Sequence, residues 1–176
     1  MDKSEIKLRE LKDSDADGML EWMHNEEIQK NFRKPMLSYT RERVMDFIQS
    51  AKYDIVEGAS IHFAITNTED EYLGTVSLKE LDLESCSAEY AIVLRKSMQG
   101  KGYAKAATLQ LLAKGFREYE LERIYLNVLS DNVKAQELYK RCGFMYEGES
   151  RKAVRINGRL RSLKWYSILK EEYEER

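Results

Sequence analysis

A glycine-rich segment has the residue types to bind a phosphate group: residues 99–104 read Gln-Gly-Lys-Gly-Tyr-Ala. The segment follows an apolar run that ends at Leu94 and precedes a helical pattern, so its backbone amides are predicted to lie at a helix N-terminus, where they attract anions. Its glycines permit left-handed dihedrals and close approach, and Lys101, Arg95 and Lys105 add positive charge. A plain glycine turn after a strand would show the same Gly-x-Gly pattern, so the rest of the sequence has to decide.

The spacing of the segment excludes the two best-known phosphate loops. A Walker A loop requires GxxxxGK followed by Ser or Thr, and a Rossmann loop requires GxGxxG with a later acidic residue. Residues 99–104 fit neither pattern. The anion site that they predict therefore belongs to neither of these nucleotide-binding classes.

The elements that would position this segment begin with a strand and two helices. Residues 6–11 alternate apolar and polar side chains at the period of a half-buried strand. Capping oxygens at residues 13–15 precede a helical stripe that runs to about Asn25. A second helical stripe extends over residues 40–51, and the single proline, Pro35, lies in the loop between the two.

Three predicted strands and a long helix occupy the middle of the chain. Residues 61–67 and 72–81 are rich in β-branched and aromatic side chains and are separated by a polar turn, which predicts a hairpin. Residues 88–94 are a third strand candidate. From Gly102 to Phe116, apolar residues recur at spacings of three and four, so we expect the longest helix there.

The C-terminal part alternates between strand and helix patterns. Residues 124–128 return to strand period, and residues 132–141 predict a short helix that ends at Gly143, a residue suited to a left-handed stop. Two further strands, 144–153 and 160–169, are joined by an Asn-Gly dipeptide typical of a hairpin turn. Strands in succession, interrupted by helices, predict an α+β fold with a mixed sheet rather than a doubly wound dinucleotide fold.

The composition indicates a single domain over residues 1–176, long enough to bury its own core. The chain has 29 basic and 31 acidic side chains, so its balance does not favour a nucleic-acid partner. It lacks any run near the roughly 18 apolar residues of a membrane span, and it begins with charged residues, so we expect a cytoplasmic protein without a membrane partner. Cys86 and Cys142 are far apart, which favours reduced thiols and no metal site.

Two motifs in the correct order resemble those of a known family. Gln99, Gly102 and Ala104 match Q/R-x-x-G-x-G/A after a strand, and this pattern is similar to the signature of the GNAT (general-control N-acetyltransferase) superfamily. Residues 132–144 resemble the family's N-xx-A-xxx-Y-xxx-GF helix, at the usual distance after the intervening strand. Residues 146–159 resemble the C-terminal hairpin of the branch of ribosomal-protein-alanine, spermidine and amino-sugar N-acetyltransferases.

The resemblance implies a fold and a cosubstrate. The fold would be the α+β GNAT acyl-CoA N-acyltransferase fold, a mixed, mostly antiparallel splayed sheet of about seven strands flanked by about four helices. Its sheet would open between residues 88–94 and 123–129, with the pantetheine of acetyl-CoA in the opening. The residues expected to contact the cosubstrate are Ile92, Val93, Leu94, Arg95, Gln99, Gly100, Lys101, Gly102, Tyr103, Ala104, Asn132, Ala135 and Tyr139.

The resemblance also suggests catalytic roles. Tyr139 lies where GNAT enzymes keep a tyrosine close to the cofactor sulfur, and it would donate a proton to the departing thiolate, although a core aromatic would fit the same helix face. Glu89 is the candidate general base, and a structural glutamate explains its position as well. A backbone amide near Val93 would stabilise the oxyanion. Asn132 would cap its helix and bond the pantetheine.

The acceptor is expected to be a primary amine that attacks acetyl-CoA directly in a ternary complex. In this family the N-terminal helices and the C-terminal hairpin bind the acceptor, and here they offer Trp22, Glu26, Phe32 and Arg33. Acidic residues could attract a polyamine and Arg33 a sugar phosphate, so we rank a small-molecule amine slightly above a protein N-terminus and leave a homodimer open. The alternative is an inactive acyl-CoA-binding or regulatory module, which the presence of Tyr139 disfavours.

Overall fold

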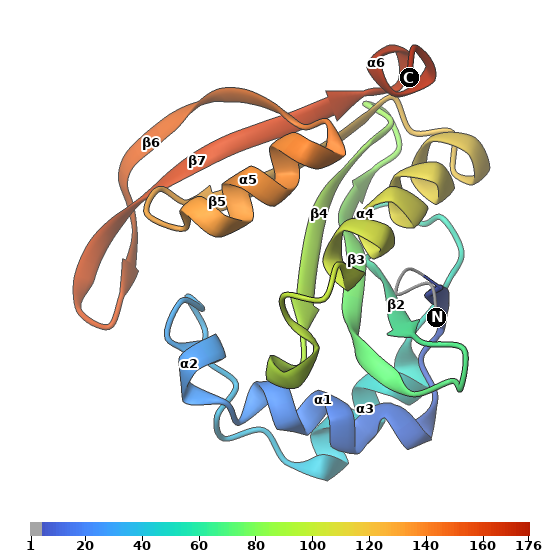
Figure 1. The fold of residues 1–176 in the computed structure, drawn as a ribbon, viewed down its shortest axis with the longest axis vertical. Coiled ribbons are helices and arrows are strands. Elements are labelled where there is room, and N and C mark those ends of the chain that lie inside the picture. Colours follow the sequence, from blue (N-terminus) through green and yellow to red (C-terminus); the bar gives the residue numbers. More distant parts are fainter. Residues whose placement is uncertain (1–4) are drawn as a thin grey trace.

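The computed structural model describes residues 5–176, which form one sheet with helices on both faces (Figure 1). The strands are β1 (Lys7–Glu10), β2 (Ile61–Thr66), β3 (Tyr72–Asp82), β4 (Ser87–Leu94), β5 (Arg123–Leu129), β6 (Met145–Ile156) and β7 (Arg159–Leu169). The helices are α1 (Ala16–Met23), α2 (Glu26–Gln29), α3 (Arg41–Ser50), α4 (Tyr103–Ala113), α5 (Val133–Cys142) and α6 (Lys170–Glu174). Short 3-10 turns lie at Asp13–Asp15 and Lys96–Met98, and a π-helical turn at Lys114–Glu118 extends α4.

The sheet opens in its middle. The strand order is β1-β2-β3-β4-β5-β7-β6, and only the β4–β5 pair is parallel within the described residues. That pair is short: Ser87 to Glu89 lie opposite Arg123 to Tyr125, and beyond them the two strands diverge. Figure 1 shows the divergence between the green β4 and the orange β5. The α+β class, the mixed seven-stranded sheet and the predicted opening are confirmed.

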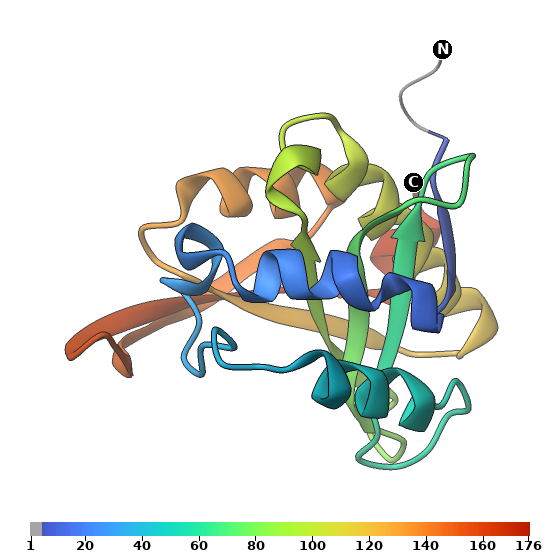
Figure 2. The ribbon, with the colours of Figure 1, turned by 90° about the horizontal axis from the view of Figure 1, so that it is seen from below.

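Helices cover the two faces of the sheet and form two cores. On one face, α4 contributes Ala107, Leu111 and Leu112 to a large apolar core with strands β2 to β5 and β7. On the other face, α1 and α3 form a second core that includes Ala64 and Tyr72 of the sheet. Figure 2 shows α4 and α5 on one side of the strands and α3 on the other.

The two helices beside the opening begin and end as the sequence predicts. The Oδ1 atom of Asn132 accepts a hydrogen bond from the Ala135 amide at 3.2 Å and caps α5, while Gly143 ends that helix with φ of +101°. Gly102 begins α4 with φ of +91°, and no side chain caps this helix. The N-terminus of α4 therefore keeps free backbone donors.

The start of α1 differs from the prediction. Residues 13–15 do not cap the helix with their side chains but form a 3-10 turn. The buried Asp15 carboxylate instead accepts hydrogen bonds from the Arg9 guanidinium at 2.7 and 2.8 Å and from the Lys12 amide at 2.8 Å. The helix also ends at Met23, because Asn25 caps the separate helix α2.

Strands β6 and β7 form a long hairpin at one end of the sheet. Asn157 and Gly158 both have positive φ, +48° and +76°, which matches the expected Asn-Gly turn. The hairpin extends well beyond α5 in Figure 1, and Figure 2 shows its tip projecting from the body. β6 is the outermost strand of the sheet, so its outer edge has no strand partner among the described residues.

Candidate active site

The loop before α4 leaves open space above an uncapped helix N-terminus. Gly100 and Gly102 have φ of +76° and +91°, values that favour glycine. A Cβ atom built on either glycine would meet no atom within 4 Å. The first amides of α4 are therefore accessible to an anion as large as a pyrophosphate, and the exposed side chain of Lys101 lies between the two glycines.

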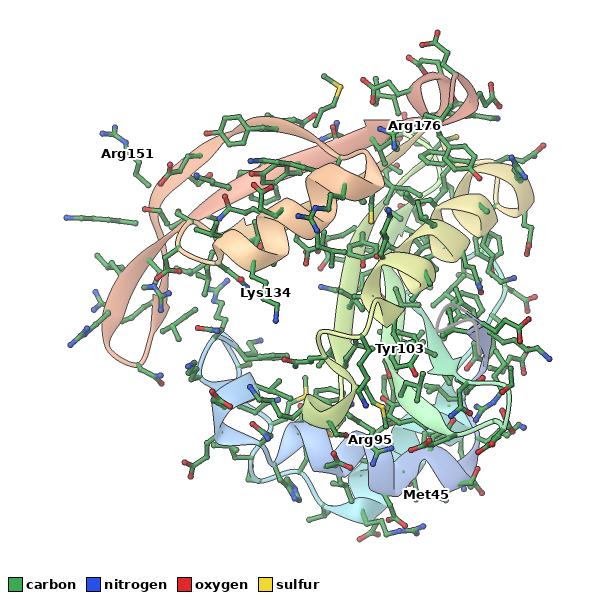
Figure 3. All side chains as sticks on the ribbon, viewed as in Figure 1. Met45, Arg95, Tyr103, Lys134, Arg151 and Arg176 are labelled. Carbon is green, nitrogen blue, oxygen red and sulfur yellow. The ribbon has the colours of Figure 1, made fainter. Side chains whose placement is uncertain are left out.

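The side chain of Arg95 is engaged elsewhere. Its guanidinium lies 2.7 Å from Glu21 and 2.9 Å from Glu71, and Figure 3 shows it beside α1. Gln99 is turned back, with its Nε2 atom donating to the Leu94 carbonyl at 3.4 Å. Both residues were expected to contact the cosubstrate, and those contacts stay predictions, while their side chains have partners within the protein.

Lys134 is a residue that the sequence reasoning did not select. It lies in the first turn of α5, and Figure 3 shows its side chain directed into the space between α5 and the loop that precedes α4. An exposed lysine at a helix start gives no sequence signal of a site. Its ammonium adds positive charge on the α5 side of that space.

Tyr139 lies in the last turn of α5. It packs edge to face against Tyr90, with ring centroids 5.8 Å apart, and against Phe144 at 6.0 Å. Its hydroxyl makes no hydrogen bond within residues 5–176 and is not sealed from solvent. Burial raises the pKa of Tyr139 to about 12, so the phenol keeps its proton at neutral pH. A protonated hydroxyl without a protein partner is suited to a general acid.

Tyr90 holds Tyr139 in place from the neighbouring strand. Its hydroxyl lies 2.7 Å from Thr108 Oγ1, and the Thr108 hydroxyl donates to the Ala104 carbonyl in the first turn of α4. Burial raises the pKa of Tyr90 well above its ordinary value, so it too stays neutral. These contacts connect the start of α4 with the ring of Tyr139, which the sequence alone did not indicate.

Glu89 is the last β4 residue paired with β5, so it lies where the sheet begins to open. Side chains alternate along a strand, and Glu89 therefore points to the face opposite that of Tyr90 and Tyr139. Its carboxylate accepts a hydrogen bond from Asn127 Nδ2 at 3.0 Å and lies 3.4 Å from the Lys79 ammonium. The side chain is 16% exposed, which leaves it accessible to a proton from solvent or substrate.

The backbone of β4 offers amides to the opening. The Arg95 amide donates to the Leu73 carbonyl of β3, and the β3–β4 register is regular from Gly74 opposite Leu94 down to Glu89. Donors alternate along an antiparallel ladder, so the Val93 amide is also directed to β3. The amides of Ile92 and Leu94 face the gap instead, and they replace Val93 as candidates for the oxyanion donor.

The four residues expected to bind the acceptor do not line one common surface. Trp22 is buried, with its Nε1 atom donating to the Tyr72 hydroxyl at 2.9 Å and its ring 6.3 Å from that of Phe32. Arg33 is exposed. Glu26 lines an open hollow of about 670 Å³, together with His24, Asn25, Glu27 and Lys30. Trp22 is thus a core residue, and Glu26 alone lies in a concave surface.

Among residues 5–176, no three His, Cys, Asp or Glu side chains gather as metal ligands would. No helix in this range is both long and apolar enough to cross a membrane. The groups that do gather around the opening are a phenol, a carboxylate, backbone amides and lysine ammonium groups.

Comparisons with known proteins agree on one family. A family model described as acetyltransferase (GNAT) domain matches residues 5–145. Spermidine N(1)-acetyltransferase from Vibrio cholerae is 30% identical over 97% of this chain and 96% of its own, and the uncharacterized N-acetyltransferase p20 from Bacillus licheniformis is 31% identical over 96% and 94%. The fold is similar to a crystal structure of the Vibrio cholerae spermidine N-acetyltransferase in complex with CoA and spermine, with a TM-score of 0.87, 28% identity and coverage of 97% and 99%.

Proposed function

The chain belongs to the GNAT acetyltransferase family, and we propose that it transfers the acetyl group of acetyl-CoA to a primary amine by direct attack in a ternary complex. The observation that supports this most strongly is the uncapped N-terminus of α4 beside the opening of the sheet. The N-terminus of α4 would supply amides for a pyrophosphate, and the opening of the sheet would supply strand edges for an extended pantetheine arm. The two features lie at consecutive points of one β4–α4 unit.

The residues present fit acetyl-CoA. The open space above Gly100 and Gly102 would accept the pyrophosphate against the α4 amides, with Lys101 and Lys134 nearby. The edge of β4 at Ile92 to Leu94 would bond the pantetheine amides, as a partner strand would. Asn132 uses only its Oδ1 atom to cap α5, so its amide NH2 remains available as a donor. When bound, acetyl-CoA supplies an activated thioester.

Two side chains would carry the proton transfers, and they lie on opposite faces of the sheet beside the opening. Tyr139, protonated and without a protein partner, would donate its proton to the departing thiolate. Glu89, on the other face of β4, would accept a proton from the ammonium group of the acceptor, directly or through water, and so release the neutral amine for attack. The Ile92 and Leu94 amides would stabilise the negative charge that develops on the acetyl oxygen. Ala135 and Tyr103 would line the opening.

A general base is useful because the acceptor must lose a proton before it can attack. A free alkylamine with a pKa near 10 is almost wholly protonated at pH 7, which costs about 4 kcal/mol. A small-molecule amine is the preferred acceptor class, since the relatives of nearly full length include a protein named for spermidine. Glu26, in the hollow beside α2, is the best-placed residue to attract a cationic substrate.

A thermal-shift comparison of ligands tests the cofactor assignment. A ligand that binds only the folded state raises its stability by RT ln(1 + [L]/Kd), about 2.7 kcal/mol at 100 times Kd. We expect acetyl-CoA to stabilise the protein strongly and ATP or NAD far less. Equal shifts from all three ligands would contradict a pantetheine site, and no shift from acetyl-CoA would contradict the cofactor assignment.

An acceptor screen that follows free thiol release tests catalysis itself. Polyamines, amino sugars and a peptide with a free N-terminus cover the three acceptor classes. We expect turnover with at least one small-molecule amine. Acetyl-CoA binding without turnover on any acceptor would favour an inactive acyl-CoA-binding module of the same fold.

A further inference from the structure

One segment of the molecule concentrates positive charge. Residues 150–164, which we name the basic ribbon, contain six of the 29 Lys and Arg residues and none of the 31 Asp and Glu residues. The rest of the chain therefore carries 23 basic against 31 acidic side chains, from the same counts. The near-neutral total of −2 hides this separation, and the sequence-level expectation of no nucleic-acid partner was based on that total.

Five of the six cations of the basic ribbon have no carboxylate partner. Only Arg161 forms an ion pair among the described residues, with Asp131. Arg155 donates to the Gly158 carbonyl, and Lys164 lies 3.4 Å from the Gln136 amide oxygen, a neutral group. Outside the ribbon, Arg9, Arg41, Arg95 and Arg123 each contact Asp or Glu.

The shape of the basic ribbon exposes these cations. It consists of the outer parts of β6 and β7, and the hairpin projects beyond the body of the protein in Figures 1 and 2. Arg151, Lys152, Arg155 and Arg159 are exposed, and Figure 3 shows Arg151 directed away from the body. At about 3.3 Å per residue, each strand of the ribbon spans about 20 Å.

Protection of the sheet edge does not explain this charge. An edge strand avoids unwanted pairing with one or two charged residues of either sign. Only Lys164 lies where β7 is paired with β5; the other five cations lie in the two-stranded part of the hairpin, and they exceed the one or two charges that edge protection needs. The charges also all have one sign, at a cost in mutual repulsion. A polyanion that covers both faces of the hairpin would relieve that repulsion.

We propose that the basic ribbon is a docking surface for the phosphate backbone of RNA. Four of its six cations are arginines, which bind phosphates through two parallel hydrogen bonds, and these arginines lie along the two strands of one hairpin. No residue between 150 and 164 is aromatic, so the ribbon offers no platform for base stacking. It therefore binds the backbone through charge and does not distinguish sequences. The proposal does not depend on acetyl transfer.

Fluorescence anisotropy with a labelled 20-nucleotide RNA of mixed sequence tests the proposal, with KCl varied from low to physiological concentration. The four exposed cations predict that log Kobs falls with log[KCl] with a slope of about −2.8 on single strands. Replacing three of them, in Arg151→Gln/Lys152→Gln/Arg159→Gln, should weaken binding and reduce the slope by about 2. Oligo(U) and oligo(A) should bind alike.

Two further variants control for folding and for total charge. Lys7→Gln/Lys52→Gln/Arg141→Gln removes the same charge from exposed cations of the body and should leave the RNA slope unchanged. Arg151→Lys/Arg159→Lys keeps the ribbon charge and should retain binding. The proposal is overturned if wild type fails to bind RNA at 50 mM KCl, or if the control triple variant loses as much as the ribbon variant. It is also overturned if the ribbon variant changes only the sedimentation of the free protein or its binding to anionic vesicles.

Discussion

The proposed cofactor side and the proposed acceptor side of this molecule are built by different means. On the cofactor side, from β4 through α5, backbone groups do most of the positioning: two left-handed glycines, an uncapped helix and a strand edge. On the acceptor side, formed by α1, α2 and the β6–β7 hairpin, positioning depends on individual side chains such as Glu26 in an open hollow. A site built from backbone groups requires particular residues at fixed spacing, such as glycines in a turn. A site built from individual side chains has no such fixed spacing in the sequence.

This difference decides what can be inferred about specificity. The geometry of residues 99–104 supports the proposed cosubstrate, because few ligands need helix amides and an open strand edge together. No acceptor is supported in the same way, since Trp22 is used for core packing and Arg33 is simply exposed. The predicted effects of the substitutions test whether activity depends on backbone positioning on one side and on individual side chains on the other.

The largest effect is expected from Tyr139→Phe, which removes a hydroxyl from the cofactor side without opening a cavity. The rate constant kcat should fall by about 100- to 10,000-fold for every acceptor, the usual contribution of a positioned acid. Acetyl-CoA affinity, measured by calorimetry, should be nearly unchanged because the ring still packs on Tyr90 and Phe144. Tyr146→Phe, at a tyrosine 54% exposed on β6, is the matched control. Wild-type turnover in Tyr139→Phe, with chemistry rate-limiting, would make Tyr139 a packing residue.

A somewhat smaller effect is expected from Glu89→Gln, at the boundary between the two sides. Gln keeps the size of Glu89 and an oxygen that can accept from Asn127, but it cannot take a proton. At pH 7, kcat/KM should fall by about 100-fold, and the loss should shrink as pH rises toward the pKa of the amine. The pH–rate profile is the measurement, and the exposed Glu84→Gln is its control. An equal loss at every pH would show that Glu89 only holds Lys79 and Asn127.

Gly102→Val should weaken cofactor binding by about 10- to 100-fold, because a side chain there would enter the space above the α4 amides. Positive φ makes any such variant strained, by about 1–3 kcal/mol. Gly58→Val is a matched control, since Gly58 also has positive φ, +70°, and open space around it but lies far along the chain in a loop. Both variants should lose stability, and only Gly102→Val should lose acetyl-CoA affinity by calorimetric titration. Unchanged acetyl-CoA affinity in Gly102→Val would show that residues 99–104 form a turn that does not bind the cosubstrate.

The same contrast explains how much could be predicted from the sequence. Periodicity located the strands and the main helices, and Asn132 and Gly143 were correctly expected at the ends of α5. The Asp15 prediction failed because the carboxylate found partners on Arg9, which only the folded chain brings near. The contacts of Glu89 with Lys79 and Asn127 depend in the same way on strand register.

The smallest effect is expected from Glu147→Gln, which tests how the hairpin of the acceptor side is attached to the sheet. The Arg123 guanidinium donates to both carboxylate oxygens of Glu147 at 2.6 and 2.7 Å, and Ser167 donates to one of them. These contacts lower the pKa of Glu147 from 4.5 to about 2, the Arg123 hydrogen bonds most of all.

A carboxylate whose pKa is lower in the folded state stabilises it fully above pH 4.5 and loses that contribution as pH falls toward 2. The pair is partly exposed, so its contribution should stay below about 1 kcal/mol, or about 2 °C in Tm. Glu147→Gln should therefore melt slightly below wild type at pH 7, with a difference that narrows by pH 3. Glu149→Gln, at a nearby β6 carboxylate that accepts from Ser130, is the control and should melt close to wild type at pH 7. If the Tm difference between Glu147→Gln and wild type is the same at pH 7 and pH 3, the Glu147–Arg123 ion pair does not stabilise the hairpin. The hairpin would then be held by the hydrogen bonds of its strand pairing alone.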